Sequence, residues 1–221
     1  MRSIPRLWSP LLIAGLVALF RLAPEIDLWF SGLFFDPAHG FFVKDAPTVQ
    51  FSYALFRDLP YFVIPLLLWL LFASWYWGGA RERTARRSLV YLLVVLLIGP
   101  GLLIHGGLKN HSGRARPAHV DAFGGDKHFT PAFVIADQCQ NNCSFVSGHA
   151  AMGFFFIAFA WVLRDRRWLL YGGLIGGLAG LGRIMQGSHF LSDIIVSYVV
   201  VLLTAQLCAR WLLRRWAIDP E

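Results

Sequence analysis

Two histidines with polar neighbours are the residues of this chain best suited to nucleophilic and acid–base chemistry. His189 precedes Asp193 by four residues, about one helical turn, so the two side chains share one face of a helix. A charged aspartate within an apolar helix is costly and needs a partner. A carboxylate on one imidazole nitrogen leaves the other as a nucleophile or base, although a purely structural pair is the alternative. His149, at the start of another apolar segment, is the second histidine.

Basic residues elsewhere in the chain predict an anion site. Lys109, Arg114 and Arg116 fall within eight residues, and Arg183 stands at the end of a later apolar segment. One basic residue at a membrane interface merely extends toward the headgroups, but several together favour binding of an anion. For Arg114 and the nearby His111, contact with a substrate and simple interfacial polarity explain the residue equally well.

A helix N-terminus completes this set of groups. Ser147 is a good N-cap for the apolar run that follows, and Gly148 leaves the backbone N–H groups of the first turn accessible to an anion. Together with Lys109, Arg116 and Arg183, these N–H groups suit phosphoryl transfer without a metal ion, because they hold the phosphate oxygens. One histidine then attacks in line, and the other protonates the leaving oxygen.

The elements that must position these residues are membrane-spanning helices. Of the 221 residues, 57% are hydrophobic and 15% are charged, whereas about a quarter of a soluble domain is charged. We expect an all-α integral membrane bundle of about six transmembrane helices, forming a single transmembrane domain over residues 1–221. The expected spans are Leu7–Leu22, Leu59–Trp77, Ser88–Leu108, Phe145–Leu163, Trp168–Met185 and Leu191–Leu213.

Other segments carry further structural expectations. Ile26–Phe42 is too interrupted to cross the membrane and too aromatic for a free loop, so we expect an interfacial helix, with a loop folded over the bundle as the alternative. The first span also has features of a signal peptide.

Cys139 and Cys143 can pair only in an oxidising compartment. Five glycines of the fifth span have the spacing of close helix packing, either within the bundle or in a homodimer: Gly172, Gly173, Gly176, Gly177 and Gly180.

The basic residues also orient the protein. If the N-terminus is cytoplasmic, the segments on that side hold twelve of the twenty lysines and arginines but four of the thirteen acidic residues. Cytoplasmic loops carry such an excess of Lys and Arg. We therefore expect both termini in the cytoplasm and the catalytic loops at the periplasmic face of a bacterial inner membrane. The excess of basic residues in cytoplasmic segments then accounts for the net charge of +7. For this reason no nucleic acid partner is expected.

Three motifs in order resemble those of the type-2 phosphatidic acid phosphatase superfamily, which includes membrane lipid phosphatases and soluble vanadium haloperoxidases. They are Lys-x6-Arg-Pro at Lys109–Pro117, Ser-Gly-His at Ser147–His149, and Arg-x5-His-x3-Asp at Arg183–Asp193. The chain has Val146 where the family usually has Pro, and Gly182 where it usually has Ser. Neither difference removes a charged or titrating group.

The resemblance implies a metal-independent lipid phosphatase without a cofactor. It implies that His189 is the nucleophile and passes through a phosphohistidine, that Asp193 orients this ring, and that His149 is the general acid for the leaving alcohol. The residues that it assigns to phosphate binding are Lys109, Arg116, Arg183, Ser147 and Gly148.

Several substrates and three other classes of protein are the alternatives. The stretches around Arg116 and Ser147 are similar to those of lipid A 4′-phosphatases, and the alternative substrates are a polyprenyl phosphate, namely undecaprenyl diphosphate, and the phospholipid phosphatidylglycerophosphate. A transporter with a His–Asp proton relay would place ionisable residues deep in several spans, whereas here they gather at one face. A metal-dependent hydrolase would not need the three cations, which already occupy the role of a metal. An inactive lipid-binding relative is disfavoured because every charged or titrating motif residue is present.

Overall fold

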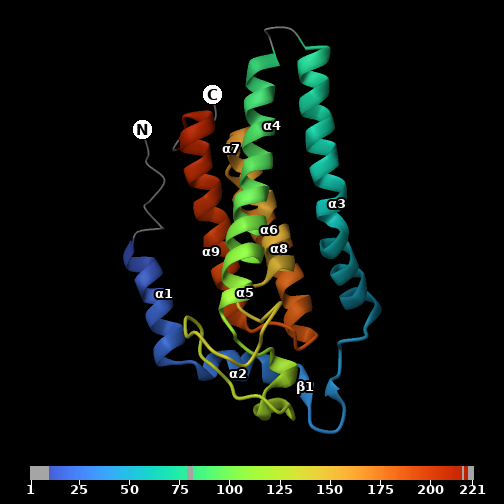
Figure 1. Cartoon of the computed structure of the whole chain (residues 1–221), viewed down its shortest axis with the longest axis vertical. Coiled ribbons are helices and arrows are strands. Elements are labelled where there is room, and N and C mark those ends of the chain that lie inside the picture. Colours follow the sequence, from blue (N-terminus) through green and yellow to red (C-terminus); the bar gives the residue numbers. More distant parts are fainter. Residues whose placement is uncertain (1–9, 79–81, 216, 219–221) are drawn as a thin grey trace.

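A bundle of helices forms the body of the molecule, and shorter segments cover one end of it (Figure 1). The computed structural model describes residues 10–78, 82–215 and 217–218. The main helices are α1 (Pro10–Leu22), α3 (Pro47–Tyr76), α4 (Arg83–Leu96), α6 (Gly148–Phe154), α7 (Phe159–Leu163), α8 (Arg167–Met185) and α9 (Leu191–Cys208).

Helices α4, α6 and α9 continue into π-helical or 3-10 segments. Helix α4 continues as a π-helix, η2 (Leu97–Leu108), and then as α5 (Lys109–His111). The π-helix contains Pro100, whose missing N–H interrupts the α-helical hydrogen bonds. A 3-10 turn, η5 (Phe155–Ala158), joins α6 to α7, and α9 ends in η6 (Ala209–Leu213).

The apolar helices follow one another in the expected order. Four of the described helices are long and apolar enough to cross a membrane, and two shorter apolar helices, Pro10–Leu22 and Gly148–Leu163, take the places of the first and fourth expected spans. Within α3, only 6% of the most apolar stretch is buried, and so much exposed apolar surface suits lipid rather than water. The predicted all-α membrane bundle is confirmed. The start of the first expected span, Leu7–Ser9, lies outside the described residues.

The starts of three expected spans differ from those of the helices by three residues or more, including the third span, which was expected from Ser88 although α4 begins at Arg83. Helix α3 begins at Pro47 instead of Leu59, and proline is favourable in the first turn of a helix. Arg57 and Asp58, which directly precede the expected start, pair with each other on the exposed surface of the helix at 2.7 Å. The fourth expected span begins only at Gly148, because the preceding Ser147 is its extended N-cap.

The segment between the first two main helices is part helix and part hairpin. Helix α2 (Glu25–Gly32) covers the first half of the expected interfacial helix. Strands β1 (Phe35–Asp36) and β2 (Gly40–Phe41) then form an antiparallel hairpin. Gly40 has a φ of 68°, which a residue without a side chain adopts readily. Phe41 is buried, so the hairpin folds over the end of the bundle, and each of the two expectations for Ile26–Phe42 describes part of it.

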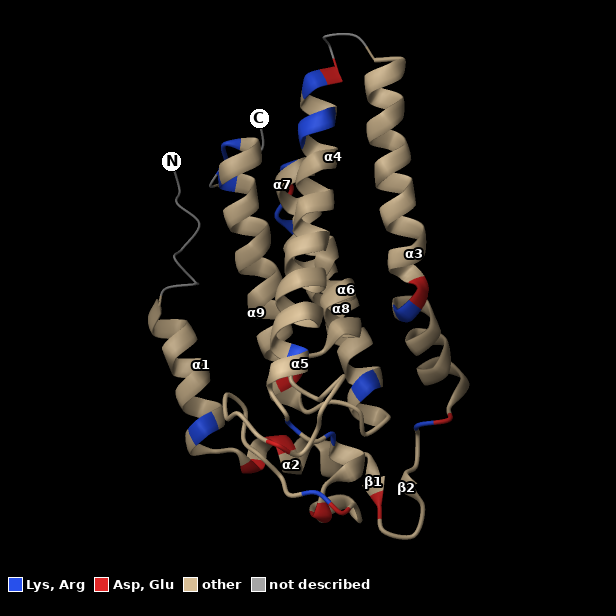
Figure 2. Cartoon of the chain, viewed as in Figure 1, with Lys and Arg blue, Asp and Glu red and all other residues tan. Residues whose placement is uncertain are grey.

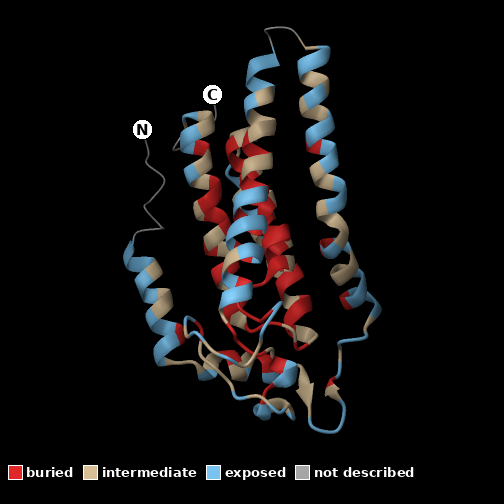
Figure 3. Cartoon of the chain, viewed as in Figure 1, coloured by how far each residue is buried: buried red, intermediate tan, exposed pale blue. Residues whose placement is uncertain are grey.

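The core lies where α6, α8 and α9 meet, as the buried residues in Figure 3 show. Glycines of α8 permit this close approach. A Cβ at Gly172 would lie 2.4 Å from the backbone nitrogen of Ile157, and one at Gly176 would lie 2.1 Å from the Phe154 ring. Gly177 faces open space instead. The glycine spacing therefore serves packing within the bundle.

Candidate active site

The three motifs meet at the end of the bundle that α2 and the hairpin cover. Lys109 lies in α5, His149 in the first turn of α6, Arg183 in the last turn of α8 and Asp193 in the first turn of α9. Arg116 directly precedes a 3-10 turn, η3 (Pro117–His119). The charge of Lys109 is repelled by those of Arg116 and Arg183. The structure thus brings together basic residues from distant parts of the chain.

His189 is held in a form suited to nucleophilic attack. The ring is fully buried, its Nδ1 lies 3.3 Å from Oδ2 of Asp193, and its Nε2 has no hydrogen-bond partner. Burial lowers the pKa of His189 to about 3, although the Asp193 carboxylate opposes this shift. A neutral ring that donates through Nδ1 keeps the lone pair of Nε2 free.

The Asp193 carboxylate is fixed by several donors besides His189. Its Oδ2 accepts hydrogen bonds from the Phe190 backbone N–H at 2.9 Å and from Ser144 Oγ at 2.5 Å. Its Oδ1 accepts one from Nη1 of Arg114 at 2.6 Å. A carboxylate held at both oxygens cannot rotate freely, so it defines the orientation of the His189 ring.

Arg114 has neither of the roles that the sequence suggests for it, because it is only 1% exposed. Its Nη2 donates to Oδ2 of Asp27 at 2.8 Å, while its Nη1 contacts Asp193. The guanidinium also lies 4.2 Å from the centre of the Phe190 ring. Removing one partner from a buried ion network costs about 3–5 kcal/mol, so Arg114 holds this end of the molecule together.

Asp27 in α2 is a buried residue that the sequence analysis missed. It is 0% exposed, and its carboxylate accepts hydrogen bonds from the backbone N–H and the Oγ of Ser192 at 2.8 and 2.5 Å. Burial raises the pKa of Asp27, whereas the charge of Arg114 lowers it. An acidic residue in the first turn of a short helix looks like an ordinary favourable charge at a helix N-terminus, so local sequence gave no sign of this network.

His149 lies close to the same basic residues. Its Nε2 is buried and has no hydrogen-bond partner, and it is within electrostatic reach of Arg183, His189 and Lys109. The imidazole stacks on the ring of Tyr53 at 4.9 Å, and the Arg183 guanidinium lies 4.7 Å from the centre of the same ring. Tyr53, which the sequence analysis also missed, therefore orients two of the motif side chains.

The start of α6 is tied to the third motif by one hydroxyl. Ser197 Oγ accepts a hydrogen bond from the Ser147 backbone N–H at 2.9 Å and donates to the backbone oxygen of Asp193 at 2.7 Å. A Cβ at Gly148 would lie 2.7 Å from Nε2 of His105, so a larger residue there would displace this exposed side chain. These contacts place the first turn of α6 beside the start of α9.

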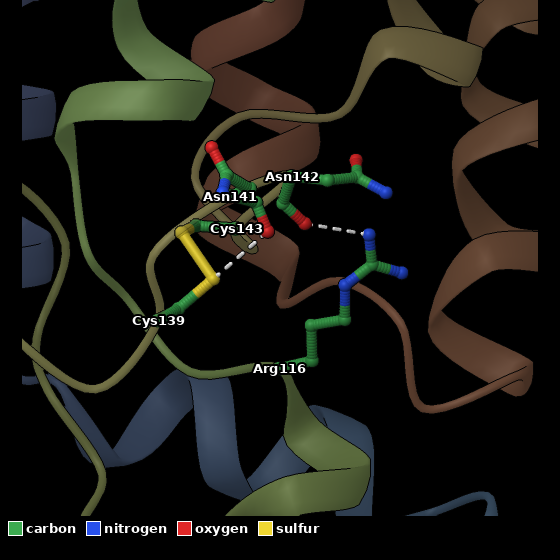
Figure 4. The surroundings of a disulfide bond; sticks show 5 residues. All are labelled: Arg116, Cys139, Asn141, Asn142 and Cys143. Atoms are coloured by element: carbon green, nitrogen blue, oxygen red, sulfur yellow. Dashed lines mark hydrogen bonds between the residues drawn. A yellow bond between two sulfur atoms is a disulfide. The ribbon is translucent and has the colours of Figure 1, made fainter.

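A disulfide-closed loop supports the cations of the first motif (Figure 4). Cys139 and Cys143 form the disulfide that the sequence left open. The backbone oxygen of Asn142 accepts a hydrogen bond from Nη2 of Arg116 at 2.7 Å, and the backbone N–H of Cys143 donates to the Lys109 oxygen at 3.3 Å. The loop thus contacts both residues of the motif, Arg116 through its guanidinium and Lys109 through its backbone oxygen.

Two openings reach this end of the bundle. An apolar groove of about 390 Å³ lies between α3, η2 and α6, and its lining includes Phe56, Tyr61, Ile64, Leu97, Met152 and His149. A polar opening of about 390 Å³ is lined by groups that include Arg116, His119, Asn141, Asn142, Gln186 and Ser188. The motif residues thus have an apolar approach on one side and a polar one on another.

Comparisons with known proteins give the family. Residues 88–217 match the PAP2 superfamily. The chain is 36% identical over 190 residues to the lipid A 4′-phosphatase of Francisella tularensis subsp. novicida (strain U112), which covers 84% of this chain and 85% of that protein. It is 36% identical over 201 residues to the lipid A 4′-phosphatases of Rhizobium leguminosarum and Rhizobium etli, which covers 84% of this chain and 86% and 78% of those proteins. No solved structure matches the chain significantly.

The matched family is the one that the three motifs resemble. The match covers more than half of the chain, and it includes all three motifs. The chain therefore belongs to the PAP2 superfamily, as a phosphoric monoester hydrolase that acts on a lipid phosphate.

Proposed function

We propose that this enzyme removes the 4′-phosphate of lipid A at the periplasmic face of the bacterial inner membrane, through a phosphohistidine on His189. The observation that carries the mechanism is the unpartnered Nε2 of the buried His189, next to the charges of Lys109 and Arg183. The choice of lipid rests on the three relatives named above. Undecaprenyl diphosphate and phosphatidylglycerophosphate are the alternative substrates.

In the first proposed step, Lys109, Arg116 and Arg183 bind the non-bridging oxygens of the phosphate together with N–H groups at the start of α6. The Nε2 of His189 attacks phosphorus, and the bond from phosphorus to the lipid oxygen breaks. His149 gives its proton to that oxygen, so the lipid leaves as an alcohol. The Asp193 carboxylate stabilises the positive charge that develops on the His189 ring.

In the second step, water replaces the lipid alcohol. The neutral His149 takes a proton from this water as it attacks phosphorus, and the bond between phosphorus and His189 breaks. Inorganic phosphate leaves, His189 is neutral again, and His149 again carries its proton. The two histidines thus return to their starting states without any co-reactant other than water.

The two openings suit a lipid phosphate. In our proposal the acyl chains approach through the apolar groove, which ends at His149 and thus on the side of the leaving oxygen. Water enters and phosphate leaves through the polar opening beside Arg116 and Ser188. We also propose a single phosphatase domain over residues 1–221, because Asp27 and Tyr53 contact the motifs from outside the matched region.

The experiment is phosphate release by detergent-purified enzyme from lipid A, undecaprenyl diphosphate, phosphatidylglycerophosphate and phosphatidic acid, each with and without EDTA. We expect release from lipid A that resists EDTA and vanishes in His189→Ala. His128→Ala is the matched control, since this ring is exposed and pairs with Asp121. Its activity should equal that of the wild type. A phosphoprotein that is labile to acid and stable to base should be trapped in the wild type but not in His189→Ala.

Each part of the proposal has its own contradicting result. Unchanged release by His189→Ala overturns the phosphohistidine mechanism. Loss of release with EDTA points to a metal-dependent enzyme. Preference for another lipid in the panel replaces lipid A as the substrate while leaving the mechanism intact.

A further inference from the structure

A buried chain of ionic contacts leads from α2 to the proposed nucleophile. Asp27 and Asp193 are both 0% exposed, and Arg114 between them is 1% exposed. One guanidinium nitrogen of Arg114 contacts Asp27 at 2.8 Å, and another contacts Asp193 at 2.6 Å. Asp27 has no place in the three motifs, yet it shares the arginine that holds the carboxylate behind His189.

Ser192 forms a second connection between the same groups. It donates its backbone N–H and its Oγ to the Asp27 carboxylate, and its Oγ accepts a hydrogen bond from Nη1 of Arg114 at 2.9 Å. Ser192 directly precedes Asp193 at the start of α9. Asp27 therefore fixes both the backbone next to Asp193 and the arginine that contacts its side chain.

We propose that Asp27 is a positioning residue for phosphoryl transfer. Through Arg114 and Ser192 it holds the Asp193 carboxylate in one orientation, and Asp193 in turn aims Nε2 of His189 at phosphorus. This inference rests on the proposed function, in which His189 is the nucleophile. A purely structural role, in which the network only anchors α2 to α9, makes a different kinetic prediction.

The predicted signature is a loss of turnover without a loss of binding. Asp27→Asn keeps the shape of the side chain but removes the negative charge that Arg114 contacts, so Arg114 is held less firmly and its grip on Oδ1 of Asp193 weakens. Lys109, Arg116 and Arg183 come from other elements and still bind the phosphate. Small displacements of a reacting group lower the rate by up to about 100-fold, whereas substrate binding does not depend on the aim of His189.

The test compares wild type, Asp27→Asn and Asp126→Asn as detergent-solubilised full-length enzymes, with kcat expressed per folded molecule after gel filtration. For Asp27→Asn we expect kcat and the rate of phosphoenzyme formation to fall about 10- to 100-fold. The KM and the inhibition constant of inorganic phosphate should stay within about twofold of the wild-type values, because an equally well-bound ground state leaves both unchanged. Asp126→Asn, which alters an exposed carboxylate on a loop, should match the wild type.

Ser192→Ala covers the case in which Asp27→Asn does not fold. It removes one donor to Asp27 but keeps all charges and the backbone contact, and we expect a smaller fall in kcat with an unchanged KM. A wild-type kcat per folded molecule in the variant that folds overturns the positioning role, as does a rise in KM alone. If His189→Ala is inactive while these variants are normal, only this inference fails. If His189→Ala is active, the proposed function fails.

Discussion

His189 lies where an imidazole ring is hard to charge. It is fully buried, and the nearby Lys109 and Arg183 add to the cost of a proton on the ring. Asp193 works in the opposite direction, since its carboxylate favours the charged ring. In the proposed reaction, this balance keeps the ring neutral until a bond to phosphorus begins to form, and Asp193 then stabilises the developing charge. Burial and ion pairing thus act at different stages of the proposed reaction.

This balance predicts a dependence of stability on pH. The folded-state pKa of His189, about 3, lies below the unfolded value of about 6.5, so between these values the unfolded chain binds the extra proton. The free energy of unfolding should therefore decrease as pH falls below about 6.5, by about 1.4 kcal/mol per pH unit from this residue. Thermal unfolding of wild type and His189→Gln, measured in detergent from about pH 4.5 to 7, isolates the effect. The advantage of the wild type should shrink toward acid, and a constant difference would contradict the prediction.

At the scale of the elements, the position of helix α8 depends on glycines, whose lack of side chains lets it pack closely. Its glycine face lies against α6 and η5, with Gly172 beside the backbone of Ile157. A neighbour made of backbone cannot move aside as a flexible side chain can. The position of Arg183, in the last turn of the same helix, depends on this contact.

Alanine substitutions on the two faces of α8 should therefore differ. Gly172→Ala should lower the free energy of unfolding by about 1–3 kcal/mol, the usual cost of overpacking. Gly177→Ala, on the open face, should leave it unchanged or raise it by up to about 1 kcal/mol through helix propensity. Thermal unfolding in detergent measures both. Equal losses in the two variants would show that packing against α6 and η5 is not the cause.

The disulfide-closed loop is a second positioning element. It presents one backbone oxygen to Arg116 and one backbone N–H to the oxygen of Lys109. The next residue, Ser144, donates to Asp193. A short covalent ring therefore supports residues of the first and third motifs together.

Removing this ring should weaken substrate binding. In the Cys139→Ala/Cys143→Ala variant, Arg116 must be ordered when the phosphate binds, at about 0.5–1.5 kcal/mol, so KM should rise about 2- to 10-fold. Stability should fall by about 2 kcal/mol, because the unfolded chain gains conformational entropy without the cross-link. Cys208→Ser is the control, because Cys208 lies in α9 and is not part of the disulfide. Steady-state kinetics on a lipid phosphate measures this KM. An unchanged KM would show that the loop does not contribute to phosphate binding.

For the whole molecule, the described charges divide between the two ends of the bundle. Figure 2 shows basic residues at the start of α4, at the turn between α7 and α8 and near the end of α9, which is the end opposite α2 and the hairpin. The site end carries acidic and basic residues together. Because cytoplasmic segments carry the excess of Lys and Arg, this division favours a site that faces the periplasm.

Cysteine labelling in intact cells tests this orientation. In a Cys208→Ser background, Asp126→Cys on the exposed loop at the site end should react with a membrane-impermeant maleimide. Glu82→Cys, also exposed but at the opposite end, should react only after the inner membrane is permeabilised. The reverse pattern would place the site in the cytoplasm.

The sequence predicted those features that depend on local spacing. His189 and Asp193 are one helical turn apart, so their pairing could be read directly from the chain. The contact between Arg114 and Asp27 joins residues 87 positions apart, and nothing local distinguishes Arg114 from an ordinary interfacial arginine. The early start of α3 was missed because the charged Arg57 and Asp58 interrupt the apolar run. The sequence alone does not show that they pair on the surface of a helix. The apolar helices and the three motifs were thus predictable, and the buried network between them was not.

The order in which the ribosome makes these parts has a consequence for the cell. Asp27 is among the first site residues to be synthesised, but its partner Ser192 follows 165 residues later, at the start of the last described membrane helix. At about 5–20 residues per second, Lys109 and Arg116 are synthesised several seconds before His189, the proposed nucleophile. In the proposed mechanism, a chain that stalls before α9 lacks Asp193 and is inactive, so the enzyme would act on lipid only once its own insertion is nearly complete.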